Sequence, residues 1–124
     1  MGNRDLVERF FDAQRRGDLE AVAAMLDDAM VMEWPQSGER FRGRQNVLDA
    51  MRTQGSPPEF AGQPRIVGDG DVWVFMVPLR YGDQLQHYVA VVELADGRVR
   101  HGIGHWGSPF PADPARAPFL DEGR

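Results

Sequence analysis

A chain of 124 residues is long enough for one domain with a single hydrophobic core and too short for two. The net charge of −5 disfavours nucleic acid and anionic membrane surfaces as partners, because both require a basic face. There is no cysteine, and all 14 residues counted as lysine or arginine are arginine, which excludes disulfides, thiolate chemistry and lysine Schiff bases.

The side chains that remain available limit catalysis to non-covalent acid–base chemistry by aspartate, glutamate, histidine or tyrosine. None of the three serines lies in a Gly-x-Ser-x-Gly motif. No apolar run is long enough to span a bilayer, and the first residues lack the apolar core of a signal peptide. We therefore expect a cytoplasmic protein of bacterial type that uses no cofactor.

Two amphipathic helices are predicted at the start of the chain. Residues 4–16 carry one stripe of side chains at helical spacing, formed by Leu6, Val7, Phe10, Phe11 and Gln14. Gly17 is expected to end this helix, and Asp18 to cap a second helix over about residues 19–27. A helical hairpin this tight is expected to form a wall or lid rather than a separate domain.

The rest of the chain is predicted to be mostly β-structure. A third helix is expected at residues 44–52, and a loop follows it at residues 55–58. Strands are expected at residues 29–34, 39–42, 63–68, 71–81, 84–94 and 98–107. Long antiparallel strands in this order are typical of a sheet that bends around a core with helices on one face.

Two histidines, His101 and His105, are four residues apart, the spacing that brings two metal ligands together on a helix. This segment follows a hairpin turn and is expected to be a strand, on which four residues span roughly 13 Å at about 3.3 Å per residue. One ion cannot bind both side chains at that distance. We therefore predict no metal site, with the histidines at polar positions on an interface or on an outer sheet face.

Aromatic residues are the candidates for a ligand pocket. Trp34 and Trp106 each lie beside a turn residue near a strand end, where a cavity would open. Trp73 and Phe75 fit a core position better than a pocket position.

The candidates for catalysis are Glu33, His87, Tyr88 and Arg100. Glu33 could act as a base if apolar surroundings raise its pKa. The alternative is that strand alternation points Glu33 to solvent when Trp34 faces inward. Arg100 could pair with Glu33 or with a ligand anion, or it could simply be solvated.

Several segments resemble the SnoaL-like branch of the nuclear transport factor 2-like superfamily, which includes ketosteroid isomerase and polyketide cyclases. These segments are residues 7–11, 17–20, 33–43, 88–92, 96–99 and 105–110. The resemblance implies an α+β cone, in which three helices wrap a curved, mostly antiparallel sheet around a deep apolar pocket. It also implies a homodimer packed through the sheet. The cone domain would span residues 1–107, and a proline-rich tail would span residues 108–124.

The catalytic residues of the family mostly fail to carry over. The base aspartate of ketosteroid isomerase relatives corresponds to Trp34, their oxyanion tyrosine to Phe10, and their second oxyanion acid falls near Ala90. The histidine and aspartate of the His-Trp-Asp run in polyketide cyclases fall on Gly102 and Gly104.

The same alignment puts Arg100, Gly102, Gly104 and Trp106 on the pocket face. Two glycines there would either leave room for a flat ligand beside the indole or only ease the bend of a curved strand.

We therefore predict a protein that binds a small apolar or cyclic molecule. The predicted ligand-binding residues are Phe10, Trp34, Trp73, Phe75, Tyr88, Arg100, Gly102, Gly104 and Trp106. The alternative is an isomerase, cyclase or dehydratase acting on a cyclic ketone or polyketide-like substrate, with Glu33 or a histidine as base and Tyr88 or Arg100 stabilising an oxyanion. A third possibility is a protein-interaction module with a vestigial pocket.

Overall fold

The computed structural model describes residues 2–121 of the chain. Within these residues the helices are α1 (Asn3–Arg15), α2 (Leu19–Met25), α3 (Arg44–Arg52) and the 3₁₀ helix η1 (Pro114–Phe119). The strands are β1 (Leu26–Trp34), β2 (Glu39–Arg42), β3 (Glu59–Phe60), β4 (Arg65–Asp69), β5 (Val72–Tyr81), β6 (Gln84–Ala95) and β7 (Arg98–Gly107). No helix in this part of the chain combines the length and the apolar character needed to cross a bilayer.

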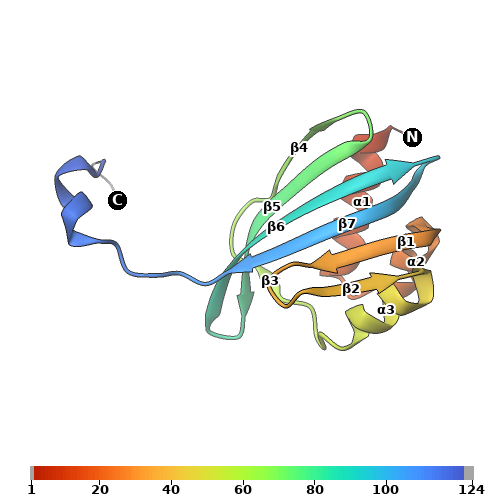
Figure 1. Cartoon of the computed structure of the whole chain (residues 1–124), viewed down its shortest axis with the longest axis horizontal. Helices are drawn as coiled ribbons and strands as arrows, with labels where there is room; N and C mark the ends of the chain where they lie inside the picture. Colours follow the sequence, from red (N-terminus) through yellow and green to blue (C-terminus); the bar gives the residue numbers. More distant parts are fainter. Residues whose placement is uncertain (1, 122–124) are drawn as a thin grey trace.

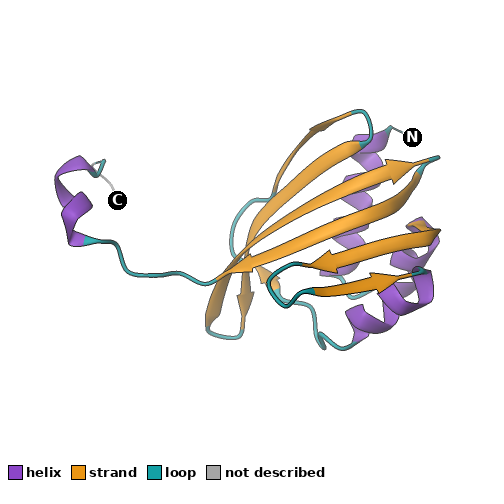
Figure 2. Ribbon diagram, viewed as in Figure 1, coloured by secondary structure: helices purple, strands orange, loops and turns teal. Residues whose placement is uncertain are grey.

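The strands form one curved sheet in the order β2-β1-β7-β6-β5-β3, and β4 also pairs with β5. All strand pairs are antiparallel except β1 and β7, which run parallel. The sheet stays open, and α1, α2 and α3 lie on its inner side (Figures 1 and 2). The prediction of an α+β cone with a mostly antiparallel sheet is confirmed.

The core lies between the helices and the inner face of the sheet. The apolar stripe of α1 is buried against β5, where Phe11 stacks on Phe75 with 3.9 Å between ring centroids. Along β5, alternate side chains from Trp73 to Leu79 are buried, as expected of a strand with one face on a core. Burying a side chain of this kind contributes about 1.5–3 kcal/mol.

Some boundaries differ from those predicted. Strand β1 begins at Leu26 rather than at residue 29, and α2 ends at Met25. Leu26 pairs with Val99 of β7 across an irregular register, so a tertiary strand pairing shortens the helix. The two-residue strand β3 was not expected, because a segment this short carries no periodic pattern.

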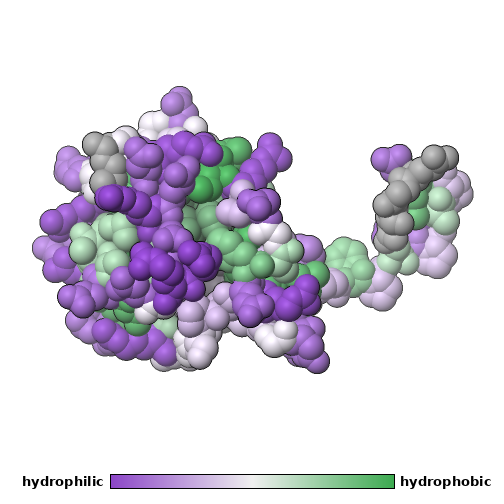
Figure 3. All heavy atoms as spheres, turned by 180° about the vertical axis from the view of Figure 1, so that it is seen from behind, coloured by the Kyte–Doolittle hydropathy of each residue, from purple (hydrophilic) through white to green (hydrophobic). Residues whose placement is uncertain are grey.

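Residues 108–121 form an arm that stands away from the cone (Figure 1). Its root is held where the Gln36 side chain hydrogen-bonds both the N–H and the carbonyl of Trp106, and where the Gln86 amide donates to Ser108 Oγ at 2.9 Å. Phe110 and Phe119 in the arm are each 83% exposed. The last residues of the predicted tail, 122–124, lie outside the described residues. Figure 3 shows the arm and its exposed hydrophobic side chains from the opposite side.

Candidate functional site

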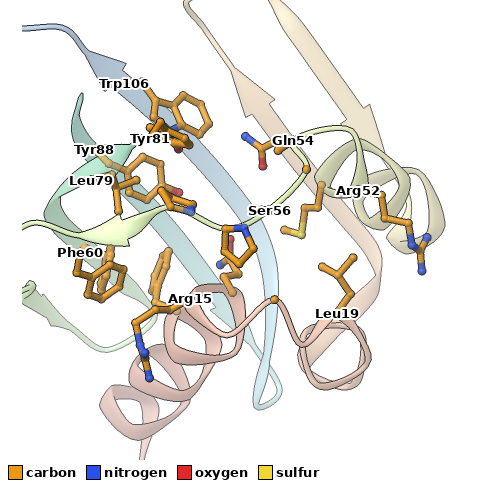
Figure 4. A pocket seen from close by; sticks show the side chains of 18 of the residues that line it. Arg15, Leu19, Arg52, Gln54, Ser56, Phe60, Leu79, Tyr81, Tyr88 and Trp106 are labelled. Carbon is orange, nitrogen blue, oxygen red and sulfur yellow. The ribbon is translucent and has the colours of Figure 1, made fainter. Parts of the chain in front are cut away.

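A cavity of about 540 Å³ lies between the helices and the inner face of the sheet (Figure 4). Its walls come from α1, the start of α2, α3, the loop of residues 54–58, and the strands β1, β3, β5, β6 and β7. A smaller space of about 30 Å³ shares part of this lining and extends toward the centre of β6 and β7. Small-molecule sites commonly measure about 300–1,000 Å³, so the larger cavity has the volume of a ligand site.

Three aromatic side chains form one end of the cavity. Trp34 ends β1 and lies beside Trp106 of the parallel neighbour β7, with ring centroids 5.7 Å apart at 88°. Tyr88 of β6 is the cross-strand partner of Trp106, and their ring centroids lie 5.1 Å apart. The order of strands in the sheet therefore brings together residues from three distant parts of the sequence.

The tyrosine hydroxyls supply polar groups at this aromatic end. The indole N–H of Trp106 donates a hydrogen bond to the Tyr81 hydroxyl at 3.0 Å. Burial raises the pKa of Tyr81, and the bond from Trp106 partly offsets this shift. Burial also raises the pKa of Tyr88 well above its usual range, and the neighbouring Tyr81 adds to the effect. Both phenols therefore stay neutral at ordinary pH.

An aromatic wall and a charged rim border the rest of the cavity. Phe60 of β3 lies 6.0 Å from Phe75 between ring centroids, and the Arg15 guanidinium carbon lies 6.0 Å from the Phe60 ring centre. Arg15 is paired with Asp12 at 2.6 Å. Arg52 on the opposite rim is likewise paired with Asp49, at 2.7 Å. In Figure 4 both arginines point away from the centre of the cavity.

Seven of the nine predicted ligand-binding residues border the larger cavity or the smaller space beside it. Trp34, Phe75, Tyr88 and Trp106 line the larger cavity, and Phe10, Gly102 and Gly104 line the smaller one. Trp73 faces inward but lies at the far end of β5, where its indole N–H donates to the Gly70 carbonyl at 2.9 Å. Trp73 therefore belongs to the core and lines neither space.

Arg100 does not face the pocket as strict alternation along β7 predicted. The register between β6 and β7 shifts, so that Leu94 pairs with Val99 and Glu93 with His101. Arg100 is the extra residue of this β-bulge and is exposed. Beyond the bulge, alternation resumes with Gly102, Gly104 and Trp106 facing inward.

The other candidates for catalysis lie on the outer face of the sheet. Glu33 Oε2 and His101 Nε2 are 2.7 Å apart there, and the second nitrogen of His101 lies 3.7 Å from Glu93. His87 is exposed opposite Pro78. Among the described residues that line the larger cavity there is no aspartate, glutamate or histidine. Of the four candidates, only Tyr88 lines the cavity.

The two inward glycines do not simply leave empty space. A Cβ at Gly104 would lie 3.2 Å from Trp106 Cη2 and 3.5 Å from Tyr88 Cε1. At Gly102 the nearest atom would be the Met30 methyl carbon, at 3.4 Å. The absence of a side chain at Gly104 lets the Trp106 indole lie flat on the strand, so this glycine shapes the aromatic end.

Part of the lining was not predicted from the sequence. Tyr81 shares the inward face of Phe75 and Leu79, so extending the period-two pattern of β5 would have found it. The loop of residues 54–58 closes one side of the cavity and has no periodic signal that could reveal its position. Gln14 was recognised on the apolar stripe of the first helix but not as a pocket residue.

An open cone of this shape, with helices closing an internal cavity, is the nuclear transport factor 2-like fold. An NTF-2 like protein of unknown function from Burkholderia xenovorans is 28% identical, with 96% of this chain and 93% of that chain covered and a TM-score of 0.84. A "putative ketosteroid isomerase" from Kribbella flavida is 27% identical, with 98% and 89% covered and a TM-score of 0.84. An LEH-like epoxide hydrolase from M. tuberculosis is 25% identical, with 82% and 80% covered and a TM-score of 0.64.

A family model described as the SnoaL-like domain matches residues 7–102. The chain therefore belongs to the SnoaL-like domain family, which confirms the resemblance noted in the sequence. A search of curated proteins found no match. Because one fold hosts many chemistries, the residues lining the cavity must decide the function.

Proposed function

We propose that this SnoaL-like protein binds a small, apolar, cyclic or aromatic molecule in its cavity. The cavity itself carries the proposal: it has a volume of about 540 Å³ and is lined mainly by aromatic and aliphatic side chains. Small-molecule sites combine such walls with a few placed polar groups. Here the polar groups at the aromatic end are the hydroxyls of Tyr81 and Tyr88.

Catalysis on the bound molecule is the second candidate. It is favoured by the similarity to an LEH-like epoxide hydrolase and to a "putative ketosteroid isomerase". The described lining of the larger cavity offers no carboxylate or imidazole as a base, and the high pKa of Tyr88 makes its phenolate scarce. Binding is therefore the leading proposal, and turnover is an outcome to be tested.

The test is a thermal-shift screen with cyclic ketones, terpenoids, steroids and aromatic polyketides. A ligand that binds only the folded state at about 100 times its Kd stabilises it by about 2.7 kcal/mol. We expect a reproducible rise in Tm with at least one of these classes, and recovery of the ligand would show whether it has been changed. No shift with any class would contradict the proposal.

A pair of variants shows whether the cavity is the site. Met51 lines both spaces, so Met51→Trp should occupy part of the cavity and weaken the shift. Ala24→Trp places the same side chain on the exposed surface of α2 and should leave the shift unchanged. An undiminished shift in a folded Met51→Trp variant would place the ligand elsewhere.

A further inference from the structure

The Tyr88 hydroxyl has hydrogen-bonding capacity that the protein does not use. Among residues 2–121 no hydrogen bond is made by this hydroxyl, although the ring is packed between Phe75 and Trp106. Within the same residues no fully buried side-chain polar atom lacks a partner. The Tyr88 hydroxyl must therefore open onto the cavity that its side chain lines.

The Tyr81 hydroxyl differs from the Tyr88 hydroxyl, because it already accepts a hydrogen bond from another side chain. It accepts the Trp106 indole N–H at 3.0 Å, and this bond ties Tyr81 to the end of β7 (Figure 4). The two tyrosines are the only ones in the chain and line the same cavity. They differ in that one hydroxyl is held by a neighbouring side chain and the other faces the ligand space.

The surroundings favour a neutral acceptor as the partner of Tyr88. The phenol stays protonated because burial raises its pKa, so it offers a hydrogen to the cavity. The arginines of the rim are paired with Asp12 and Asp49, and the protein carries a net charge of −5, so a carboxylate gains little here. A carbonyl oxygen is a strong neutral acceptor, and a buried donor left without one costs free energy.

We infer that the ligand of this cavity carries a neutral carbonyl group beside its ring system, and that the Tyr88 hydroxyl donates a hydrogen bond to that carbonyl oxygen. Trp34 and Trp106 then flank the ring system, because they form the aromatic end next to Tyr88. Tyr88 acts as a specificity-determining residue, and Tyr81 acts as a positioning residue for Trp106. This inference rests on the proposed binding function and narrows its ligand class.

The glutamines in the lining do not select for a carbonyl group on the ligand. Gln14 of α1 and Gln54 of the following loop border the cavity as well. A carboxamide both donates and accepts, so it fits ligand donors and acceptors alike. The Tyr88 phenol can also accept, as Tyr81 does from Trp106, but a phenol is a stronger donor than acceptor, so it favours a ligand acceptor such as a carbonyl.

The test compares 1-tetralone with tetralin, two bicyclic molecules of nearly equal shape that differ in one carbonyl oxygen. We expect wild-type protein to bind 1-tetralone about tenfold more tightly, the effect of one or two neutral hydrogen bonds. Tyr88→Phe should abolish this preference while leaving the affinity for tetralin unchanged. Tyr81→Phe removes the hydroxyl that holds Trp106, so it should change the affinity for both compounds alike and keep the ratio between them.

A spectroscopic measurement separates a direct contact from a structural effect. The carbonyl stretching frequency of bound 1-tetralone should fall relative to its value in an apolar solvent, and Tyr88→Phe should restore that value. Equal binding of the two compounds, or a preference that survives Tyr88→Phe, would overturn this inference while leaving the binding function intact. If neither compound binds, this inference fails as well, whereas the binding function fails only if no class in the thermal-shift screen raises the Tm.

Discussion

At the scale of single residues, Tyr88 and Trp106 show how strand register assigns roles. They face each other across β6 and β7, and both point inward by the regular alternation of their strands. The bulge at Arg100 interrupts the alternation of β7 further along. Without the bulge the inward set of β7 would continue through Arg100 and bring a charge into the core. The bulge therefore keeps the inner face of β7 apolar.

The two tyrosines should make stability fall at alkaline pH. Burial raises the pKa of both phenols, so the folded protein holds protons that the unfolded chain releases near about pH 10. The contribution of the two neutral phenols to the free energy of unfolding is complete below that pH. It is lost as pH rises, because the unfolded state then binds fewer protons than the folded state. Urea unfolding at a series of pH values should show the decline, and Tyr88→Phe should make it shallower.

Tyrosinate absorbance provides the control for this prediction. Near about pH 10 the folded protein should show less ionisation than the urea-unfolded chain, because burial raises the pKa of both phenols. A folded protein whose two tyrosines ionise at their ordinary pKa would contradict the burial of these phenols.

Gly68 is a second residue whose lack of a side chain matters. It pairs with Trp73 across β4 and β5, and a Cβ would lie 2.7 Å from Trp73 Cδ2 and against the Val72 carbonyl oxygen. Gly68→Ala should destabilise the protein by about 1–3 kcal/mol, measured by urea unfolding, because the backbone must move. Gly102→Ala meets the flexible Met30 methyl at 3.4 Å and Val92 at an ordinary contact distance of 3.9 Å, so it should cost clearly less. Equal effects of the two substitutions would contradict this prediction.

At the scale of elements, the long segments were predictable and the short ones were not. The helix over 44–52 and the strands over 39–42 and 98–107 matched their predicted bounds, because turn residues mark both ends of each. The strand β3 could not be predicted, since only its pairing with β5 orders it. The bulge at Arg100 also escaped prediction, because the local sequence carries no signal for an extra residue.

The arm should contribute little to the stability of the cone. Its aromatic residues Phe110 and Phe119 are almost fully exposed, and its root is held at Trp106 and Ser108. A chain ending after Ser108 should therefore unfold at nearly the same Tm as the full chain. A large fall in Tm would mean that the arm packs against the body in solution.

At the scale of the whole molecule, the two faces of the sheet differ in what they bury. The inner face carries the core and the cavity. The outer face presents half-exposed apolar residues, with Val91 at the centre between its cross-strand partners Val74 and Ile103. We propose that this outer face packs against a second copy of the chain, as the family resemblance implies.

A charge at the centre of that face tests the homodimer. Sedimentation of the wild-type chain should give the mass of a dimer, and Val91→Lys should shift it to the monomer because an unpaired charge would be buried. Ala24→Lys, an equal change on exposed α2, should remain dimeric. A wild-type chain that sediments as a monomer would exclude this interface.

The sequence indicated what kind of cavity to expect better than which residues line it. The aromatic end was anticipated at Trp34, Tyr88 and Trp106 because strand ends were recognisable. The loop side was not, because its position depends on how α3 and β3 are joined in space. Trp73 was misplaced because inward direction alone does not say how far along a strand the cavity extends.

The most direct measurement is tryptophan fluorescence during titration with the best ligand from the thermal-shift screen. Trp34 and Trp106 line the cavity and Trp73 does not, so the fluorescence changes of the three tryptophans show where the ligand binds. We predict a saturable change in emission that persists in Trp73→Phe and is lost when Trp34 and Trp106 are both replaced by phenylalanine. A change that depends on Trp73 alone would contradict binding in the cavity.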